Sequence, residues 1–298
     1  GLGESAQHAV MNAESEPGCF PLVVFSHGYG GERRQSTFFY THLASHGYVV
    51  AAMDHVGNTT INMISGQSKT GDIEFMRRFI LSRPADASFV IDQMIAGEAG
   101  IEIDANRIGM SGHSFGGWTT LKTLETDERI KAIVPLAPAG GKTGDDENPL
   151  PAALNFEWGR TVPALYIVSD LDSILPLSGM RDLCERNPEP KIVVVLENAD
   201  HFHFNDDVEK NQDGFKFFIE AANADADEEA KRGMDEMLSL MKPSTELVPG
   251  NHAYALINGL GLSHFDAHLR SQKDAADLLQ RDLSSVMADQ GITISLMV

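Results

Sequence analysis

Short apolar runs alternate with amphipathic stretches between residues 20 and 200, and this alternation limits the possible folds more than any other feature of the chain. Near-continuous runs of Val, Ile and Leu are typical of strands that are covered on both faces. The pattern therefore predicts an α/β fold with a mostly parallel central sheet and helices on both faces. The expected strands are Leu22 to Ser26, Tyr48 to Met53, Arg107 to Ser111, Ile130 to Leu136, Ala164 to Ser169 and Lys191 to Leu196.

Apolar residues at helical spacing lie between these runs and after them. Pro84 is expected in the first turn of its helix, where a missing N–H costs nothing. Residues 205–248 are acidic and have helical spacing, so we interpret them as a helical insertion that covers the site as a lid. The expected helices are Ser36 to Ser45, Arg83 to Ala96, Gly116 to Asp127, Leu177 to Arg186, and a last one whose apolar face (Tyr254, Ile257, Leu260, Gly261, His264, Phe265, His268 and Leu269) packs against the sheet.

The composition argues against several classes of partner. The 23 Lys and Arg against 43 Asp and Glu give a net charge of −20, which disfavours binding to nucleic acid or to an anionic membrane surface. No window of about 18 residues is free of polar and charged groups, so no membrane span is expected. Residues 1–298 are interpreted as a single domain, because no linker rich in Pro, Gly or Ser interrupts them.

The 2 cysteines, Cys19 and Cys184, lie on elements that this fold keeps apart. We therefore expect two free thiols rather than a disulfide. The sequence fixes no compartment, with a secreted or periplasmic location slightly favoured over the cytoplasm.

The segment from Gly112 to Gly116 has the pattern Gly-x-Ser-x-Gly, with Ser114 at its centre. The bare pattern arises by chance in roughly one such chain in six, so its context carries the inference. A strand ends just before Ser114 and helical spacing begins just after it. A serine on such a sharp turn needs small neighbours, because the strained backbone leaves no room for Cβ atoms at Gly112 and Gly116. Ser114 is therefore the predicted nucleophile.

A nucleophilic serine needs a base, and the base needs an acid that orients it. In this kind of fold the acid and the histidine follow later strands, in that order. Asp170 and Asp172 follow one predicted strand, and His201 and His203 follow the next. His201 is the predicted base because it comes sooner after its strand, whereas the spacing alone leaves both aspartates open.

The oxyanion of a tetrahedral intermediate requires two backbone N–H donors. Phe115, directly after the nucleophile, is one predicted donor, and Tyr29 in the glycine-rich loop after the first strand is the other. His27 in that loop is expected to be structural. No further His, Cys or Asp at ligand spacing accompanies His201 and His203, so neither a metal nor another cofactor is expected.

Taken together, these stretches resemble the α/β-hydrolase superfamily, and within it the dienelactone hydrolase and platelet-activating-factor acetylhydrolase-like esterases, which are related to cutinase-like polyester hydrolases. The resemblance implies Ser114, Asp172 and His201 as a catalytic triad, with Tyr29 and Phe115 at the oxyanion positions. The spacing of Asp172 and Pro176 is similar to the acid turn of the cutinase group, which favours Asp172 over Asp170. The matching stretches are Pro21 to Asp54, Arg107 to Gly117, Ala132 to Pro138, Asp172 to Pro176 and Ala199 to Phe202.

The chain departs from that family in ways that bear on its substrate. Polyester hydrolases of the group carry a tryptophan where this chain has Ala139, so a polymer substrate is less expected. The family has two further strands before the first matching stretch, and the chain is therefore expected to start late or to be a fragment. Trp158 is a candidate for lining the acyl pocket, whereas Trp118 is expected in the core.

These observations predict a serine carboxylic ester hydrolase that acts on small to medium esters through an acyl-enzyme. Hydrolysis of polyesters, phthalate-type aromatic esters or phospholipid acetyl groups is the alternative among enzymes. A hydrolase fold that binds without catalysis is the alternative from another class.

Overall fold

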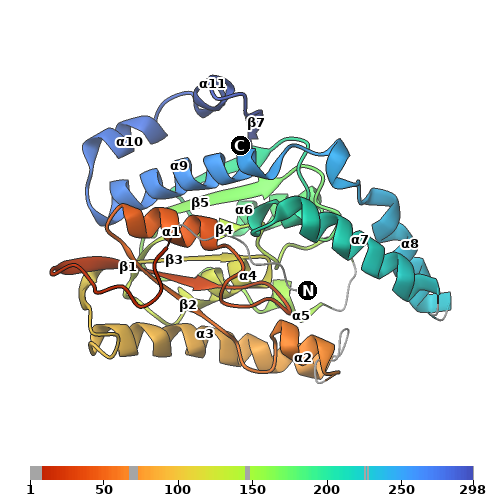
Figure 1. Ribbon diagram of the computed structural model, residues 1–298, viewed down its shortest axis with the longest axis horizontal. Helices are drawn as coiled ribbons and strands as arrows, with labels where there is room; N and C mark the ends of the chain where they lie inside the picture. Colours follow the sequence, from red (N-terminus) through yellow and green to blue (C-terminus); the bar gives the residue numbers. More distant parts are fainter. Residues whose placement is uncertain (1–8, 67–72, 145–147, 225, 227, 298) are drawn as a thin grey trace.

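The computed structural model describes residues 9–66, 73–144, 148–224, 226 and 228–297. In this part of the chain seven strands form one sheet in the order β2-β1-β3-β4-β5-β6-β7 (Figure 1). All neighbouring pairs are parallel except β6 and β7. The strands are β1 (Cys19–Ser26), β2 (Val49–Met53), β3 (Glu102–His113), β4 (Ile130–Leu136), β5 (Ala164–Ser169), β6 (Lys191–Leu196) and β7 (Ile294–Leu296).

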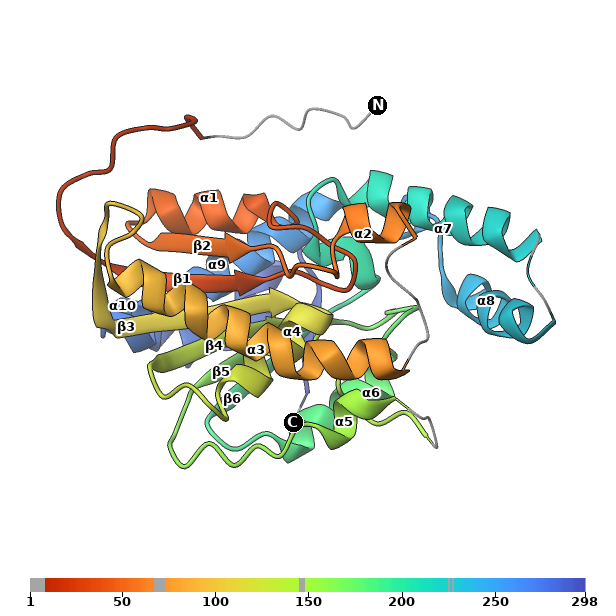
Figure 2. The same ribbon diagram turned by 90° about the horizontal axis from the view of Figure 1, so that it is seen from below.

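Helices cover both faces of the sheet, α1 and α9 one face and α3 and α4 the other (Figures 1 and 2). The helices are α1 (Thr37–Ser45), α2 (Thr60–Ile64), α3 (Ile73–Ile95), α4 (Phe115–Thr123), α5 (Pro149–Ala152), α6 (Leu177–Arg186), α7 (Val208–Ala224), α8 (Glu228–Leu240), α9 (Gly250–Leu269), α10 (Lys273–Leu279) and α11 (Leu283–Ala288), with 3-10 turns η1 (His201–Phe204) and η2 (Ser244–Glu246).

The sheet separates two hydrophobic cores, and β1 contributes to both. Leu22 and Val24 point into the core under α3 and α4, whereas Val23 and Phe25 point into the core under α1 and α9. All four side chains are buried. This two-sided burial explains why the strand sequences are continuous apolar runs, since successive side chains of a strand face opposite ways.

The predicted α/β class and all six predicted strands are confirmed. Two strand features were not expected from the sequence. β3 begins at Glu102, earlier than predicted, and β7 adds an antiparallel edge strand near the end of the described chain. β7 has three residues, two of them exposed, so it lacks the apolar run that revealed the other strands.

The expected position of Pro84 in a first helical turn is wrong, because α3 begins at Ile73 and contains Pro84 in its interior. An interior proline removes one helical hydrogen bond and costs about 3 kcal/mol. Burial of one side of the helix offsets that cost. Its buried stripe, at steps of four residues, consists of Phe79, Arg83, Ala87 and Ile91.

The last predicted core helix is present as α9, which contacts β3, β4 and β5. Its residue Gly261 allows a close approach, because a Cβ there would lie 2.7 Å from the ring of Phe39. Cys19 is exposed, Cys184 is buried, and both are free thiols as expected. None of the helices in the described ranges is both long and apolar enough to cross a bilayer.

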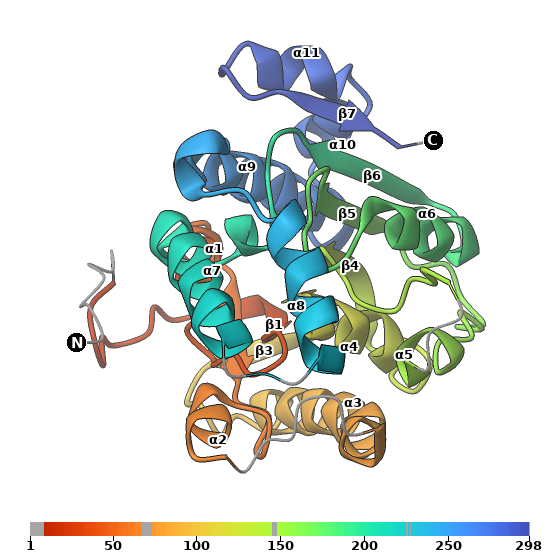
Figure 3. The same cartoon turned by 90° about the vertical axis from the view of Figure 1, so that its right-hand side faces the viewer.

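The segment predicted as a helical insertion contains α7, α8 and η2. Helices α7 and α8 form a hairpin that projects beyond the end of the sheet, as Figures 1 and 2 show from two directions. The base of the hairpin is fixed by the wholly buried Gln212, whereas Phe217 and Phe218 further out along α7 are exposed. Figure 3 shows the hairpin in front of the strand ends. Its action as a lid stays a prediction.

Candidate active site

Ser114 lies on the sharp turn between β3 and α4, as its sequence context predicts. Its backbone has φ 57° and ψ −119°, a conformation that a non-glycine residue rarely adopts. The turn is held by two backbone hydrogen bonds: the Ser114 N–H donates to the carbonyl of Leu136, and the Ala139 N–H donates to the carbonyl of Ser114, both at 2.9 Å. Such local strain persists only where the surroundings enforce it, and it is typical of functional positions.

The glycines on either side of Ser114 are required by the packing of this turn. A Cβ at Gly116 would lie 1.8 Å from the carbonyl oxygen of Ser26, and a Cβ at Gly112 would lie 2.3 Å from that of Gly116. Both contacts are with backbone atoms, which cannot move aside as a flexible side chain can. The close approach of α4 to β1 therefore demands glycine at both positions.

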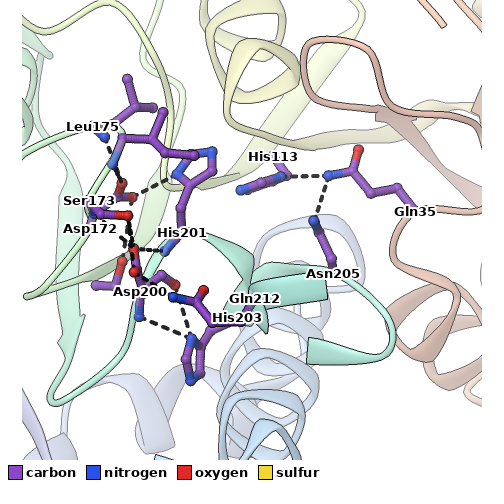
Figure 4. A network of polar contacts seen from close by, with 12 residues as sticks. Gln35, His113, Asp172, Ser173, Leu175, Asp200, His201, His203, Asn205 and Gln212 are labelled. Carbon is purple, nitrogen blue, oxygen red and sulfur yellow. Dashed lines mark hydrogen bonds and ion pairs between the residues drawn. The ribbon is translucent and has the colours of Figure 1, made fainter. Parts of the chain in front are cut away.

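His201 lies in η1 after β6, and its Nδ1 is 2.8 Å from Oδ2 of Asp172 in the loop after β5 (Figure 4). Both side chains are almost fully buried. The other carboxylate oxygen of Asp172 accepts hydrogen bonds from the backbone N–H groups of Ile174 and Leu175 at 3.0 and 2.6 Å, which fixes its orientation. Because an ionised carboxylate only accepts hydrogen bonds, Nδ1 carries the proton in the neutral imidazole, and Nε2 is then the acceptor.

The two alternative residues make other contacts. Asp170 accepts a hydrogen bond at 3.2 Å from the Ala199 N–H and makes none with His201. His203 donates from Nε2 to the carbonyl of Val248 at 2.8 Å, and its Nδ1 accepts from the Asp200 N–H at 3.0 Å. Both ring nitrogens of His203 are thus engaged by the protein backbone, which assigns it a structural part.

Asp200 is a buried residue that the sequence analysis missed. Its Oδ1 accepts hydrogen bonds from the N–H groups of His201 and Ser173 at 2.6 and 2.7 Å. Its Oδ2 accepts from Nε2 of Gln212 on α7 at 2.8 Å. The carboxylate therefore joins the loop that carries Asp172 to the turn that carries His201 (Figure 4). One available signal was its place at the start of η1, where aspartate is a common helix cap.

His113, directly before Ser114, packs its ring against that of His201 with 4.5 Å between the centroids. Gln35 donates to His113 Nδ1 at 2.6 Å and accepts from the Gly28 N–H at 2.7 Å. Burial, and to a lesser degree the neighbouring His201, holds the pKa of His113 well below its usual value. His113 is consequently neutral, and Gln35 links it to the loop after β1.

The two predicted oxyanion residues lie on neighbouring elements. Tyr29 follows β1 and Phe115 begins α4, and their ring centroids are 6.4 Å apart. Ala139 is bonded through its N–H to the carbonyl of Ser114 and is buried, so the structure brings it beside the nucleophile turn.

Trp158 lies away from that turn. Arg160 donates to the carbonyls of Trp158 and Leu124 at 3.2 and 3.0 Å, which places Trp158 beside the end of α4 opposite Ser114. Its side chain is buried in the hydrophobic core. The structure therefore does not support the prediction that Trp158 lines an acyl pocket. Trp118 is wholly buried and donates to the carbonyl of Leu150, as expected of a core residue.

Three or more His, Cys, Asp or Glu side chains arranged to hold a metal ion are not found in the described ranges. The site groups described above instead make hydrogen bonds with one another and with the backbone. They come together at the carboxyl ends of β1, β3, β5 and β6.

A mostly parallel sheet that presents a serine on a strained strand-to-helix turn, followed in chain order by an acid and a histidine, defines an α/β-hydrolase. The fold is shared with a ferulic acid esterase from Streptomyces cinnamoneus, with a TM-score of 0.67 and 23% identity over 98% of this chain and 77% of that one.

The chain belongs to the PET hydrolase-like family (PETase), whose profile matches residues 10–222. It is similar to cutinase est1 from Thermobifida alba, with 30% identity over 191 residues, which are 63% of this chain and 55% of the cutinase. A platelet-activating factor acetylhydrolase from Cavia porcellus is 26% identical over 46% of this chain and 39% of its own length. The chain thus spans little more than half of the cutinase. The predicted resemblance to cutinase-like and acetylhydrolase-like esterases is confirmed.

Proposed function

We propose that the protein is a serine carboxylic ester hydrolase in which Ser114 is the nucleophile, His201 the base and Asp172 the residue that orients it. The observation that carries this proposal is the 2.8 Å hydrogen bond between His201 Nδ1 and Asp172 Oδ2. It lies at the carboxyl ends of the strands, as does the strained turn of Ser114. In the neutral imidazole this bond places the proton on Nδ1, so that Nε2 is the acceptor that a base requires. Similarity to cutinases supports the same chemistry.

In the first half of the reaction, His201 Nε2 removes the proton of the Ser114 hydroxyl while Oγ bonds to the ester carbonyl carbon. The carbonyl electron pair moves onto the oxygen, and the N–H groups of Tyr29 and Phe115 bind the resulting oxyanion. Collapse of the intermediate breaks the bond to the alcohol, which takes the proton from Nε2. An acyl group remains on Ser114.

In the second half, water gives a proton to His201 and adds to the acyl carbon. The second oxyanion collapses, the carboxylic acid leaves, and the proton returns from His201 to Ser114 Oγ. Asp172 stays ionised throughout and stabilises the imidazolium that forms in each half.

The proposed substrates are esters of small to medium size. Ala139 beside Ser114 offers no aromatic ring on which an aromatic acyl group could stack, a contact worth about 0.5–1.5 kcal/mol. Polyester hydrolysis is the second candidate, and the match to the PET hydrolase-like family favours it. We further propose that the α7–α8 hairpin covers the substrate as a lid of the single domain.

A matched panel of esters tests both candidates. Rates on 4-nitrophenyl acetate, butyrate and octanoate are compared with rates on bis(2-hydroxyethyl) terephthalate and on a polyester film. Faster turnover of the aliphatic esters is expected. A preference for the terephthalate would instead favour polyester hydrolysis over hydrolysis of small to medium aliphatic esters. Ser114→Ala serves as control: if it retains wild-type rates, the serine mechanism is wrong. A folded wild type without any activity would favour a binding protein.

A further inference from the structure

Arg83 on α3 lies wholly buried beneath the loop that carries Tyr29. Its Nη1 donates to the carbonyl of His27 at 2.8 Å. Its Nη2 donates to the carbonyl of Gly28 at 3.1 Å and to Oδ1 of Asn58 at 2.7 Å. The guanidinium is thus clamped on two consecutive carbonyls of the loop after β1.

Burial lowers the pKa of Arg83 to about 9, which leaves the group charged at neutral pH. In the described part of the chain no salt bridge joins Arg83 to a carboxylate, and Asp86, which acts on it electrostatically, is hydrogen-bonded to His55 instead. Burying a charge without an ion pair is costly, and here hydrogen bonds to neutral groups compensate for part of that cost. Such a cost is unexpected for a group with no more than a packing role.

The bond from Arg83 to Gly28 acts on a particular peptide. The carbonyl of Gly28 and the N–H of Tyr29 belong to the same planar unit, and in a trans peptide they point in opposite directions. Arg83 therefore holds, together with His27 Nδ1 at 2.7 Å and the Gly31 N–H at 3.2 Å, one end of the peptide whose other end is the proposed oxyanion donor. Hydrogen bonding to a cation also polarises a peptide, which makes its N–H a stronger donor.

Arg83 also touches the residue that supplies the second donor. Its Cζ lies 4.3 Å from the centre of the Phe115 ring, a cation–π distance. One side chain thus contacts both the peptide before Tyr29 and the first residue of α4.

We propose that Arg83 is a positioning residue for the oxyanion hole, which fixes and polarises the Gly28–Tyr29 peptide from the side opposite the substrate and holds Phe115 in register with it. The inference rests on the function proposed above. Arg83 touches neither the substrate nor the reacting atoms, and it acts on the transition state through the Gly28–Tyr29 peptide and the side chain of Phe115.

The test compares two inhibitors that share one alkyl chain. A trifluoromethyl ketone forms a hemiketal with Ser114 and places an oxyanion in the hole, whereas the corresponding methyl ketone binds without one. In Arg83→Lys the amine cannot reproduce the planar fork that holds two carbonyls. We expect kcat and the affinity for the trifluoromethyl ketone to fall together by about 30-fold, somewhat less than loss of a whole oxyanion donor. KM and the methyl ketone affinity should change less than about twofold, because they report uniform binding.

Arg160→Lys is the matched control, because Arg160 also donates to backbone carbonyls, those of Leu124 and Asp127, at the far end of α4. It should change neither inhibitor. If Arg83→Lys does not fold, Asn58→Ala removes one anchor of the guanidinium and should lower the trifluoromethyl ketone affinity about fivefold, the equivalent of one hydrogen bond.

The outcomes separate the two proposals. Suppose that the wild type hydrolyses esters and prefers the trifluoromethyl ketone, and that Arg83→Lys or Asn58→Ala keeps the same preference. This result would leave the proposed function intact and overturn the proposed role of Arg83. Equal losses for both ketones would also overturn it, because they indicate a general structural role. A wild type with neither activity nor preference would overturn the proposed function and this inference with it.

Discussion

Replacement of Asp200 by alanine tests how the loops of the acid and the histidine are held together. The change removes the acceptor of two buried backbone donors, the N–H groups of Ser173 and His201, which lie 2.7 and 2.6 Å from Oδ1. Each buried donor left without a partner costs about 1–3 kcal/mol. Entry of water satisfies part of this demand, so we expect Asp200→Ala to lower the free energy of unfolding by about 3 kcal/mol.

The activity should fall as well, because His201 loses the bond that fixes its backbone relative to the Asp172 loop. A loss of about 100-fold in kcat at nearly constant KM is expected, as for a base displaced by about 1 Å. Urea unfolding and ester kinetics on the same preparations measure the two effects.

Two variants serve as controls. Asp170→Ala removes a neighbouring carboxylate that accepts a single backbone bond at 3.2 Å, and it should cost less than half as much stability. Asp200→Asn keeps the Oδ1 acceptor, and the unpartnered Oε1 of Gln212 can turn to accept its new N–H group. The reasoning is refuted if Asp200→Ala is no more harmful than Asp170→Ala in both stability and kcat.

Three further predictions follow from buried groups and from the hairpin. Gly116→Ala should abolish activity and soluble yield, since its Cβ would lie 1.8 Å from the Ser26 carbonyl; a folded, active variant would contradict the packing. Burial lowers the pKa of His264 to about 3. Below the unfolded value of about 6.5, the unfolded state therefore binds a proton that the folded state lacks, and the free energy of unfolding decreases as the pH is lowered. His264→Gln should reduce the dependence of the free energy of unfolding on pH by up to about 1.4 kcal/mol per pH unit. The same pH dependence in the variant and the wild type would contradict this prediction. Replacing residues 221–237 by a short Gly-Ser turn should keep the fold, because Gln212 is retained, and should change the preference for acyl length; unchanged preference would end the lid proposal.

Much of the fold follows from the sequence because each parallel strand is buried on both faces. Only a continuous apolar run satisfies that environment, so the six runs identify six strands. The Ser114 turn is readable for a similar reason, since the backbone contacts at Gly112 and Gly116 exclude every larger residue. β7 was missed because a short edge strand with one buried residue needs no such run.

The supporting residues of the site were not readable, because their contacts join distant parts of the chain. Arg83 bonds to the carbonyls of residues 27 and 28, and Asp200 joins residue 173 to residue 212. The spacing of residues along the sequence gives no information about such long-range hydrogen bonds. The prediction for Trp158 relied on its position between two strands, which suggested a loop at the site. In the structure the chain there returns to the start of β5, at the other end of the sheet.

The most direct test of the proposed mechanism is to trap the acyl-enzyme. The protein is mixed with 4-nitrophenyl butyrate, quenched with acid within milliseconds, digested, and analysed by mass spectrometry. The mechanism predicts one butyryl group on the peptide that contains Ser114, formed together with a burst of nitrophenol, and neither signal in Ser114→Ala. A butyryl group on another residue, or hydrolysis by Ser114→Ala at the wild-type rate, would contradict it.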